Sequence, residues 1–137
     1  MKKEIIVARG KIHLIELINY EIELHGNNCD LNHIDISKIN DISGIFYKSK
    51  FNGNISRWDT SNVKDMHDMF CNSEFNQAIG QWNVSNVENM TDMFSYSKFN
   101  QDISLWNTKN VKFMEHMFCN SEFDQDIGQR NVYKFAI

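Results

Sequence analysis

Three tryptophans recur at a fixed interval in this sequence, and a row of aromatic rings can form a stacking platform for sugar rings or nucleobases. Trp58, Trp82 and Trp106 are each separated by 24 residues. Each stands three residues after an isoleucine, in an alternating apolar pattern that is typical of inward-facing strand positions. The pattern therefore favours buried core rings over a binding platform.

Residues that could perform catalysis or hold a metal ion do not form a recognisable motif. The five histidines neither recur at the 24-residue interval nor accompany a motif-placed nucleophile. Asp102, Asp124 and Asp126 cluster loosely, but EF-hand spacing and a glycine-rich calcium repeat are missing. A phosphate-binding glycine loop and zinc-type Cys/His spacing are missing as well. We expect a protein that is not an enzyme and that uses no metal and no cofactor.

The cysteines do not suggest a disulfide. Cys71 and Cys119 occupy equivalent positions two repeats apart, which corresponds to about 10 Å at the spacing of neighbouring strands. A disulfide requires Cα atoms within about 7 Å. Cys29 has no obvious partner. Three unpaired thiols suit a reducing compartment better than an oxidising one.

Composition narrows the class of protein further. A chain of 137 residues with 42% hydrophobic and 23% charged residues can form one globular domain with a buried core. Its formal net charge of −4 disfavours nucleic acid and anionic lipid as partners. The longest apolar run, Ile5–Ala8, is far too short to insert into a membrane. No signal peptide is recognisable.

A 24-residue repeat organises most of the chain. Phe51, Phe75, Phe99 and Phe123 form one of several apolar columns with this period. A degenerate copy precedes them, so the repeats extend from residue 27 to residue 137, or about 4.6 units. We divide the chain into an N-terminal cap, residues 1–26, and a repeat region, residues 27–137. One repeat cannot bury its own apolar side, so the repeats must stack.

Each repeat contains two local patterns. The segment Val63–Phe70 has apolar residues at i, i+3, i+6 and i+7, which predicts a short α-helix or 3₁₀-helix. The segment Ile55–Thr60 alternates and predicts a short strand. A strand and a short helix within 24 residues match the leucine-rich-repeat pattern. The expected fold is an α/β solenoid, a short right-handed stack of strand-plus-helix units.

The N-terminal cap has a different pattern from the repeats. Ile5–Ala8 suits a strand, and the following segment has a helical apolar face. Gly26 can end this helix in a left-handed conformation. The apolar face consists of Leu14, Leu17, Ile18 and Ile22.

The repeat resembles a known family. The motif Val-x-x-Met-x-x-Met-Phe, followed by Phe-Asn-Gln-Asp-Ile-Ser-x-Trp-Asn, is similar to the BspA-like leucine-rich repeat of bacterial surface proteins and mycoplasma lipoproteins. Its clearest copy is Val87–Phe94 followed by Phe99–Asn107, and the resemblance covers about Asn27–Val132. The resemblance implies extracellular adhesion or binding of a host protein. The missing signal peptide and the unpaired cysteines instead suggest a cytoplasmic location, so both locations stay open.

The outward positions of the strand half form the candidate partner-binding surface. Strands pack about 4.8 Å apart and helices about 8–10 Å apart, so the stack should bend toward the strands and make their face concave. This face is polar and differs between repeats, whereas the inward columns hardly vary. The candidate partner-binding residues are Asp35, Arg57, Asp59, Ser61, Gln81, Asn83, Ser85, Asn107 and Lys109. The same face also includes His33, Ser37, Leu105, Gln129, Asn131 and Tyr133.

Three further columns predict contacts between neighbouring repeats. Asn62, Asn86 and Asn110 should form a ladder that satisfies main-chain groups. Asn52, Asn76, Asn100 and Asp124 should do similar work at another turn. Lys50, Glu74, Lys98 and Glu122 alternate in charge, which predicts ion pairs between adjacent repeats. Such exposed pairs contribute only about 0.2–1 kcal/mol each.

The expected function is a non-enzymatic protein–protein interaction module of the bacterial surface type, which binds a macromolecular partner through the concave strand face. Two alternatives remain. The chain could be a self-associating structural unit, for which a homodimer is the simplest form, or an intracellular adaptor or effector. We expect neither nucleic-acid binding nor membrane insertion, and the sequence does not identify the partner.

Overall fold

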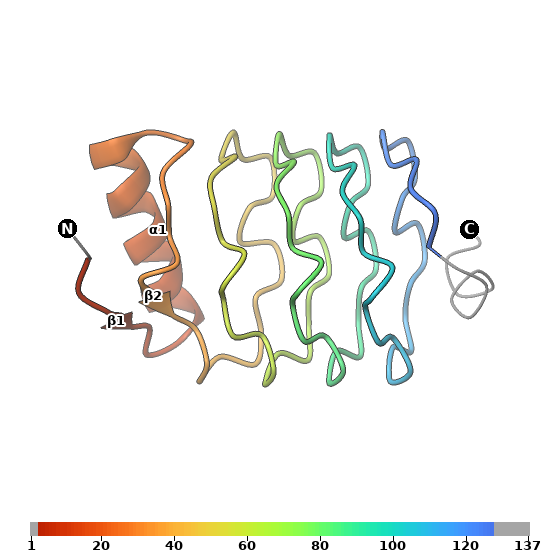
Figure 1. Ribbon diagram of the computed structural model, residues 1–137, viewed down its shortest axis with the longest axis horizontal. Helices are drawn as coiled ribbons and strands as arrows, with labels where there is room; N and C mark the ends of the chain where they lie inside the picture. Colours follow the sequence, from red (N-terminus) through yellow and green to blue (C-terminus); the bar gives the residue numbers. More distant parts are fainter. Residues whose placement is uncertain (1–2, 128–137) are drawn as a thin grey trace.

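The computed structural model describes residues 3–127 as a short strand and a helix followed by a row of stacked coils (Figure 1). Strand β1 (Ile6–Val7) pairs in parallel with strand β2 (Ile34–Asp35). Helix α1 (Lys11–His25) connects the two strands and lies at the N-terminal end of the row. The coils then follow one another along the long axis of the molecule.

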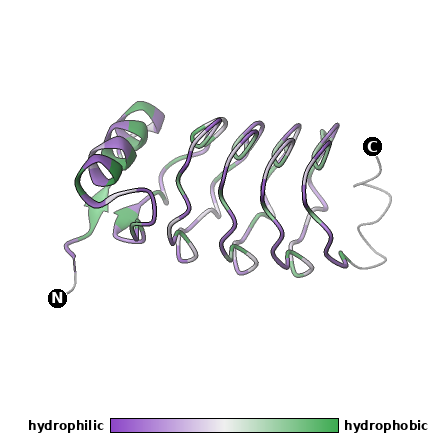
Figure 2. Ribbon diagram, turned by 90° about the horizontal axis from the view of Figure 1, so that it is seen from above, coloured by the Kyte–Doolittle hydropathy of each residue, from purple (hydrophilic) through white to green (hydrophobic). Residues whose placement is uncertain are grey.

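Helix α1 forms because one of its sides is apolar and packs against the first coil. Leu14 and Ile18 are buried, and they belong to the same apolar core as β2 and the coils. Gly26 follows the helix with a φ of 86°, and its N–H donates to Ile22 O over 2.7 Å. The strand and helix that the sequence predicts before residue 27 are therefore confirmed. Figure 2 shows α1 beside the first coil, with both apolar and polar residues on it.

Equivalent residues of successive coils lie side by side. Parallel β-bridges join Asp41 to Asp65, Asp65 to Asn89, and Asn89 to Phe113. Met66 donates its N–H to Asn89 O over 2.9 Å, which illustrates the bonds that connect one coil to the next. The four bridged segments, residues 41–48, 65–72, 89–96 and 113–120, are called the turn ladder below.

The predicted helix over Val63–Phe70 is wrong, because residues 61–72 contain no helical residue. Alternate main-chain amides in this segment have different partners. Met69 donates its N–H to Met66 O within the same coil, whereas Phe70 donates to Met93 O of the next coil. An α-helix would use these amides for its own i→i−4 bonds. The segment is instead a series of consecutive turns. The amides that make no bond within their own coil donate to carbonyls of the neighbouring coil.

Two residues per coil have left-handed backbone conformations, which interrupt any right-handed helix. In the second coil these residues are Asp68 and Asn72, each with a φ of 57°. Aspartate and asparagine adopt this conformation more readily than most residues. The equivalent residues in the other coils are Gly44, Lys48, Asp92, Tyr96, His116 and Asn120.

The predicted strand half also differs from the structure. Residues 34–35 form β2 in the first coil, but the equivalent segments 58–59, 82–83 and 106–107 are not assigned to strands. The parallel bridges of the described repeats lie in the half that was expected to be helical. The leucine-rich-repeat class of the fold stays a prediction.

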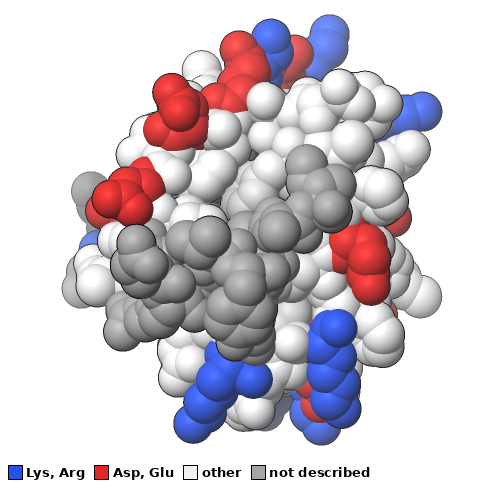
Figure 3. All heavy atoms as spheres, turned by 90° about the vertical axis from the view of Figure 1, so that its right-hand side faces the viewer, with Lys and Arg blue, Asp and Glu red and all other residues white. Residues whose placement is uncertain are grey.

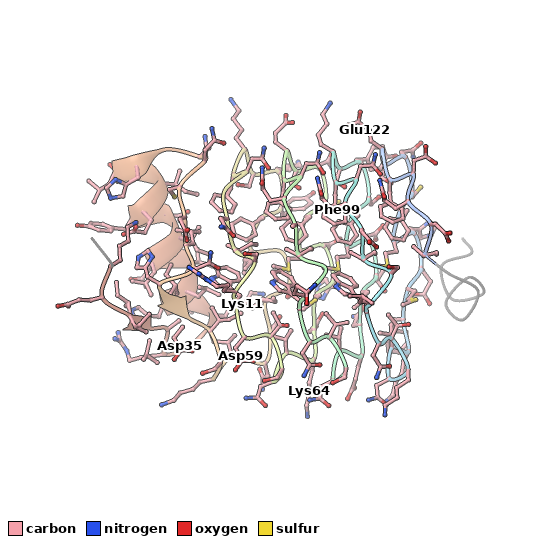
Figure 4. All side chains as sticks on the ribbon, in the orientation of Figure 1. Lys11, Asp35, Asp59, Lys64, Phe99 and Glu122 are labelled. Carbon is pink, nitrogen blue, oxygen red and sulfur yellow. The ribbon has the colours of Figure 1, made fainter. Side chains whose placement is uncertain are left out.

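Columns of aromatic rings fill the interior of the stack. The rings of Phe46, Phe70, Phe94 and Phe118 stack with centroids 5.5–5.6 Å apart. This spacing is far below the 8–10 Å that packed helices need, so the coils leave no room for helices. Figure 4 shows Phe99, a member of the second phenylalanine column, inside the stack.

The three tryptophans belong to this core, as the sequence predicts. Trp58, Trp82 and Trp106 are at most 4% exposed. Each indole N–H donates to a main-chain oxygen of the preceding coil over 2.9–3.0 Å, and Trp82 bonds Ile55 O in this way. Because the polar end of each ring is satisfied inside the stack, a sugar or nucleobase platform is excluded for these rings. Within residues 3–127, no helix is both long enough and apolar enough to cross a membrane.

We predict that Phe94→Ala lowers the free energy of unfolding by about 3–5 kcal/mol, since it leaves a cavity between neighbouring coils. Phe94 is fully buried and its ring stacks on those of Phe70, Phe99 and Phe118. Phe113→Ala provides the matched control because Phe113 is 50% exposed. Urea denaturation followed by tryptophan fluorescence measures both values. Equal losses from the two variants would contradict the assignment of the core.

Candidate functional site

Several side chains of the predicted partner-binding surface form hydrogen bonds within their own turns. The main-chain N–H of Ser61 donates to Asp59 Oδ1 over 3.0 Å, and the Ser61 hydroxyl donates to the same oxygen over 2.6 Å. Ser85 makes the same two bonds to Asn83. In the first and fourth coils the N–H bonds join Ser37 to Asp35 and Lys109 to Asn107. These residues therefore have a structural role as Asx turns.

Sequence reasoning missed this role, although a signal was present. Asp or Asn recurs at positions 35, 59, 83 and 107, with serine two residues later in the first three coils, and this spacing is typical of a side chain that caps its own turn two residues on. The structure thus places Asp59 and Asn83 in one column, as predicted. It also shows that Oδ1 of each side chain already accepts hydrogen bonds from its own turn.

One column of the predicted surface remains exposed and makes no such turn bond. Arg57 and Gln81 are exposed, and Leu105 is 67% exposed. Gln81 and Leu105 also line a small hollow of about 200 Å³. We call Arg57, Gln81 and Leu105 the variable column, because these three successive coils present different side chains at this position. Gln129, Asn131 and Tyr133, which the sequence places on the same face, lie outside the described residues.

His33 was expected to face outward with this column, but the structure buries it. Its side chain is 8% exposed, and Nε2 lies 3.4 Å from Glu21 Oε1 on α1. Lys3 Nζ lies 3.0 Å from the same Glu21 oxygen. The expectation fails because α1 packs over the first coil, which the repeat pattern alone does not show.

The two predicted asparagine ladders are confirmed. Asn86 Nδ2 donates to Ser61 O over 2.7 Å, and Asn62 and Asn110 make the equivalent bond. In the second ladder, Asn52 Oδ1 accepts the N–H of Asn76 over 2.8 Å. Asn100 and Asp124 continue this ladder with the same geometry. Asparagine at these positions therefore connects coils and does not indicate a glycan or cation site.

The alternating charge column is confirmed for one pair. Lys98 Nζ lies 3.6 Å from Glu122 Oε2. Among residues 3–127, no ion pair joins Glu74 to Lys50 or to Lys98. Figure 4 places Glu122 and Lys64 at opposite rims of the stack. Figure 3 shows that both signs of charge occur around the rim at the C-terminal end. This ion pair contributes little to the stability of the fold, since both side chains are more than half exposed.

The argument for a concave strand face loses its basis, because it required helices on the opposite half. Equivalent rings are 5.5–5.6 Å apart in the Phe46–Phe118 column of the turn ladder, whereas Trp58 and Trp82 are 6.4 Å apart. This difference favours a bend toward the turn ladder. The nine predicted partner-binding residues therefore lie on the half where equivalent rings are farther apart.

A groove of about 500 Å³ follows the outer side of the turn ladder. Asp68 and Asp92, which occupy equivalent positions in neighbouring coils, line it together with Cys71. Burial raises the pKa of the Cys71 thiol, and the carboxylates of Asp68 and Asp92 raise it further. Sequence reasoning missed the groove because it assigned these residues to a helix.

The three cysteines are free, with Cys29 and Cys71 buried and Cys119 partly exposed. Burial also raises the pKa of Cys29, and the nearby carboxylate of Glu21 adds to this effect. Both thiols are therefore held in the protonated form, which is the less reactive one.

Among residues 3–127, no group of three or more histidine, cysteine, aspartate and glutamate side chains is placed to hold a metal ion. The expectations that the protein uses no metal and no cofactor, and that it is not an enzyme, stay predictions.

Comparison with known protein families gives one match, which covers most of the repeat region. Residues 18–129 match the family described as Mycoplasma protein of unknown function, DUF285. The chain belongs to this family. Membership of DUF285 supports the mycoplasma part of the expected relationship and a bacterial origin. It does not bear on the BspA-like leucine-rich-repeat part, nor on adhesion or a surface location.

Neither the curated proteins nor the solved structures gave a significant match to this DUF285 chain. The assignment of a binding surface therefore depends on the geometry of the coils themselves.

We predict that the free energy of unfolding falls as the pH drops below about 4, the ordinary pKa of aspartate. Hydrogen bonds from Ser37 lower the pKa of Asp35. Burial opposes ionisation of Asp41, but hydrogen bonds from Ser43 and the charge of Lys11 lower its pKa overall. Because these carboxyls are more acidic in the folded chain, their stabilisation is present above the unfolded pKa and is lost as pH falls through the folded pKa.

Urea denaturation at a series of pH values measures this effect. Asp35→Asn keeps the turn, since asparagine already fills the equivalent positions 83 and 107. We expect the variant to fold at neutral pH and to lose less stability in acid than the parent chain. An identical pH dependence would show that the Asp35 hydrogen bonds do not contribute.

Proposed function

We propose that this DUF285 chain is a non-enzymatic repeat scaffold that binds a protein partner, with the variable column at the centre of the contact surface. The supporting observation is the contrast between columns. The inward tryptophan, methionine and phenylalanine columns keep one residue type in most coils, whereas the exposed variable column presents a cation, an amide and an aliphatic side chain in successive coils. Arginine is enriched among the residues that contribute most to protein–protein binding, and Leu105 adds exposed apolar surface beside the small hollow.

The neighbouring columns support the same assignment by exclusion. Asp59, Ser61, Asn83 and Ser85 satisfy one another within their turns. Their contribution to a partner would therefore be secondary to that of the variable column. Asp35, Asn107 and Lys109 extend the same surface toward the two ends of the row.

The location and the finer family assignment are part of this proposal. A BspA-like leucine-rich-repeat scaffold of the surface type agrees with the mycoplasma family and implies adhesion to another protein. Three free cysteines suit a cytoplasmic adaptor or effector equally well. Fractionation of cells that produce the full-length protein distinguishes the two locations.

Self-association is a second candidate function, and exposed apolar side chains at the N-terminal end favour it. Ile12 on α1 is 76% exposed, and Ile5 beside β1 is 65% exposed. Sedimentation velocity of the parent chain and of Ile12→Lys tests this alternative. A stable dimer that Ile12→Lys converts to monomer would favour the structural role over the adaptor role.

We predict that Arg57→Ala combined with Leu105→Ala weakens binding of the protein partner by about tenfold or more. The partner is first recovered by cross-linking to the parent chain in cells, and its affinity is then measured by biolayer interferometry. Lys64→Ala serves as the control, since Lys64 is an exposed lysine at a rim of the stack (Figure 4). Unchanged affinity in the double variant, with folding verified by circular dichroism, would overturn the assignment of the variable column.

A further inference from the structure

The groove on the turn ladder is a separate surface from the variable column. Some of its charged side chains have partners of opposite charge within the described part of the chain, and others do not. Lys11 Nζ lies 2.7 Å from Ser43 Oγ and 3.6 Å from Asp41 Oδ1. His67 Nδ1 lies 2.7 Å from Asp65 Oδ1. The basic groups of the groove therefore already have acidic partners.

The groove also contains two carboxylates that have no basic partner among the described residues. Asp68 and Asp92 are half-buried, and neither side chain makes a hydrogen bond or an ion pair with residues 3–127. They lie in adjacent coils at equivalent positions, with Cys71 near both. Both carboxylates line the same groove from adjacent coils, so a cation bound there would have two anionic partners.

The backbone does not explain why these two residues are charged. Both occupy left-handed positions, with φ values of 57° and 55°. Asn72 and Asn120 occupy the other left-handed position of their coils with φ values of 57° and 53°. Asparagine therefore satisfies this conformation without a charge. The turn therefore requires no negative charge at positions 68 and 92. In this respect Asp68 and Asp92 differ from the aspartates of the Asx turns, whose oxygens accept hydrogen bonds.

Two exposed tyrosines complete the groove. Tyr47 and Tyr96 line it from coils on either side of Cys71 and are 47% and 57% exposed. Lys48 Nζ already lies 5.3 Å from the centroid of the Tyr47 ring, so this ring accepts a cation over its face. Arginine stacks on tyrosine faces more readily than lysine does and forms bidentate bonds with carboxylates.

We propose that the turn-ladder groove binds an extended, arginine-containing segment of a protein. Alternate side chains of an extended segment are about 6.5–7 Å apart. Equivalent rings of neighbouring coils in the turn ladder are only 5.5–5.6 Å apart, so the long arginine side chains would have to converge slightly to reach the two carboxylates and the two tyrosines. The acidic groove and the basic segment are complementary in charge. This site goes beyond the partner-binding role of the variable column and does not depend on it.

The experiment measures binding of a fluorescein-labelled peptide of alternating glycine and arginine by fluorescence anisotropy. Asp68→Asn and Asp92→Asn are tested singly and together. Asp30→Asn is the matched control, since Asp30 is exposed and Asn54 makes the same turn bond one coil later. Tyr96→Ala is paired with Tyr20→Ala, which removes an exposed tyrosine from α1.

We expect the double aspartate variant to weaken binding by about tenfold or more, and Tyr96→Ala to weaken it several-fold. Asp30→Asn and Tyr20→Ala should change the dissociation constant by less than about twofold. A peptide with lysine in place of arginine should bind more weakly, and one with glutamate should not bind. The double variant should also keep the melting temperature of the parent chain, because neither carboxylate forms an ion pair with the described residues.

Three results would overturn the proposal. The parent chain could fail to bind the arginine peptide, or Asp30→Asn could weaken binding as much as Asp68→Asn, which would indicate a response to net charge alone. Equal binding of the glutamate peptide would exclude charge complementarity.

Discussion

The distance between neighbouring coils is the constraint on which the rest of this structure depends. Main-chain amides of one coil donate to carbonyls of the next at the turn ladder, and the side chains of Trp82 and Asn86 donate to carbonyls of the preceding coil elsewhere. This distance is too short for packed helices, so each coil must turn without helical hydrogen bonds. The aromatic columns then stack at 5.5–6.4 Å because their backbones are held that close.

The local pattern of one repeat indicated which residues face inward but not how the chain turns. The apolar spacing of Val63–Phe70 is typical of a helix, yet consecutive turns produce the same inward set. Two observations distinguish consecutive turns from a helix, and neither follows from the spacing of apolar residues. Alternate amides have partners 23 residues away, and Asp68 and Asn72 adopt positive φ. A recurrent Asp or Asn at these positions was the available signal in the sequence.

For the candidate sites too, the sequence predicted some features and missed others. Buried tryptophans and both asparagine ladders were predictable, since each depends on one column repeating in register. The Asx-turn role of Asp59 and Asn83 was missed, because outward polar residues were considered for a partner before their own main chain. The groove was missed because Asp68 and Asp92 were assigned to two separate helices about 8–10 Å apart, whereas consecutive turns bring the two coils closer together. Burial of His33 depends on α1, which no repeat position encodes.

The regular positions of the amide bonds in the turn ladder have a consequence for how such proteins change in length. Alternate amides of each inner coil donate to the coil after it, whereas Asp65, Asn89 and Phe113 donate to the coil before it, and both kinds of bond recur at equivalent positions. Copying or removing a whole 24-residue unit in a gene therefore leaves each donor opposite an acceptor and each ring opposite a ring. A change of one or two residues would move every apolar side chain off the interior. Variation in coil number is thus structurally tolerated, while small insertions are confined to the loops.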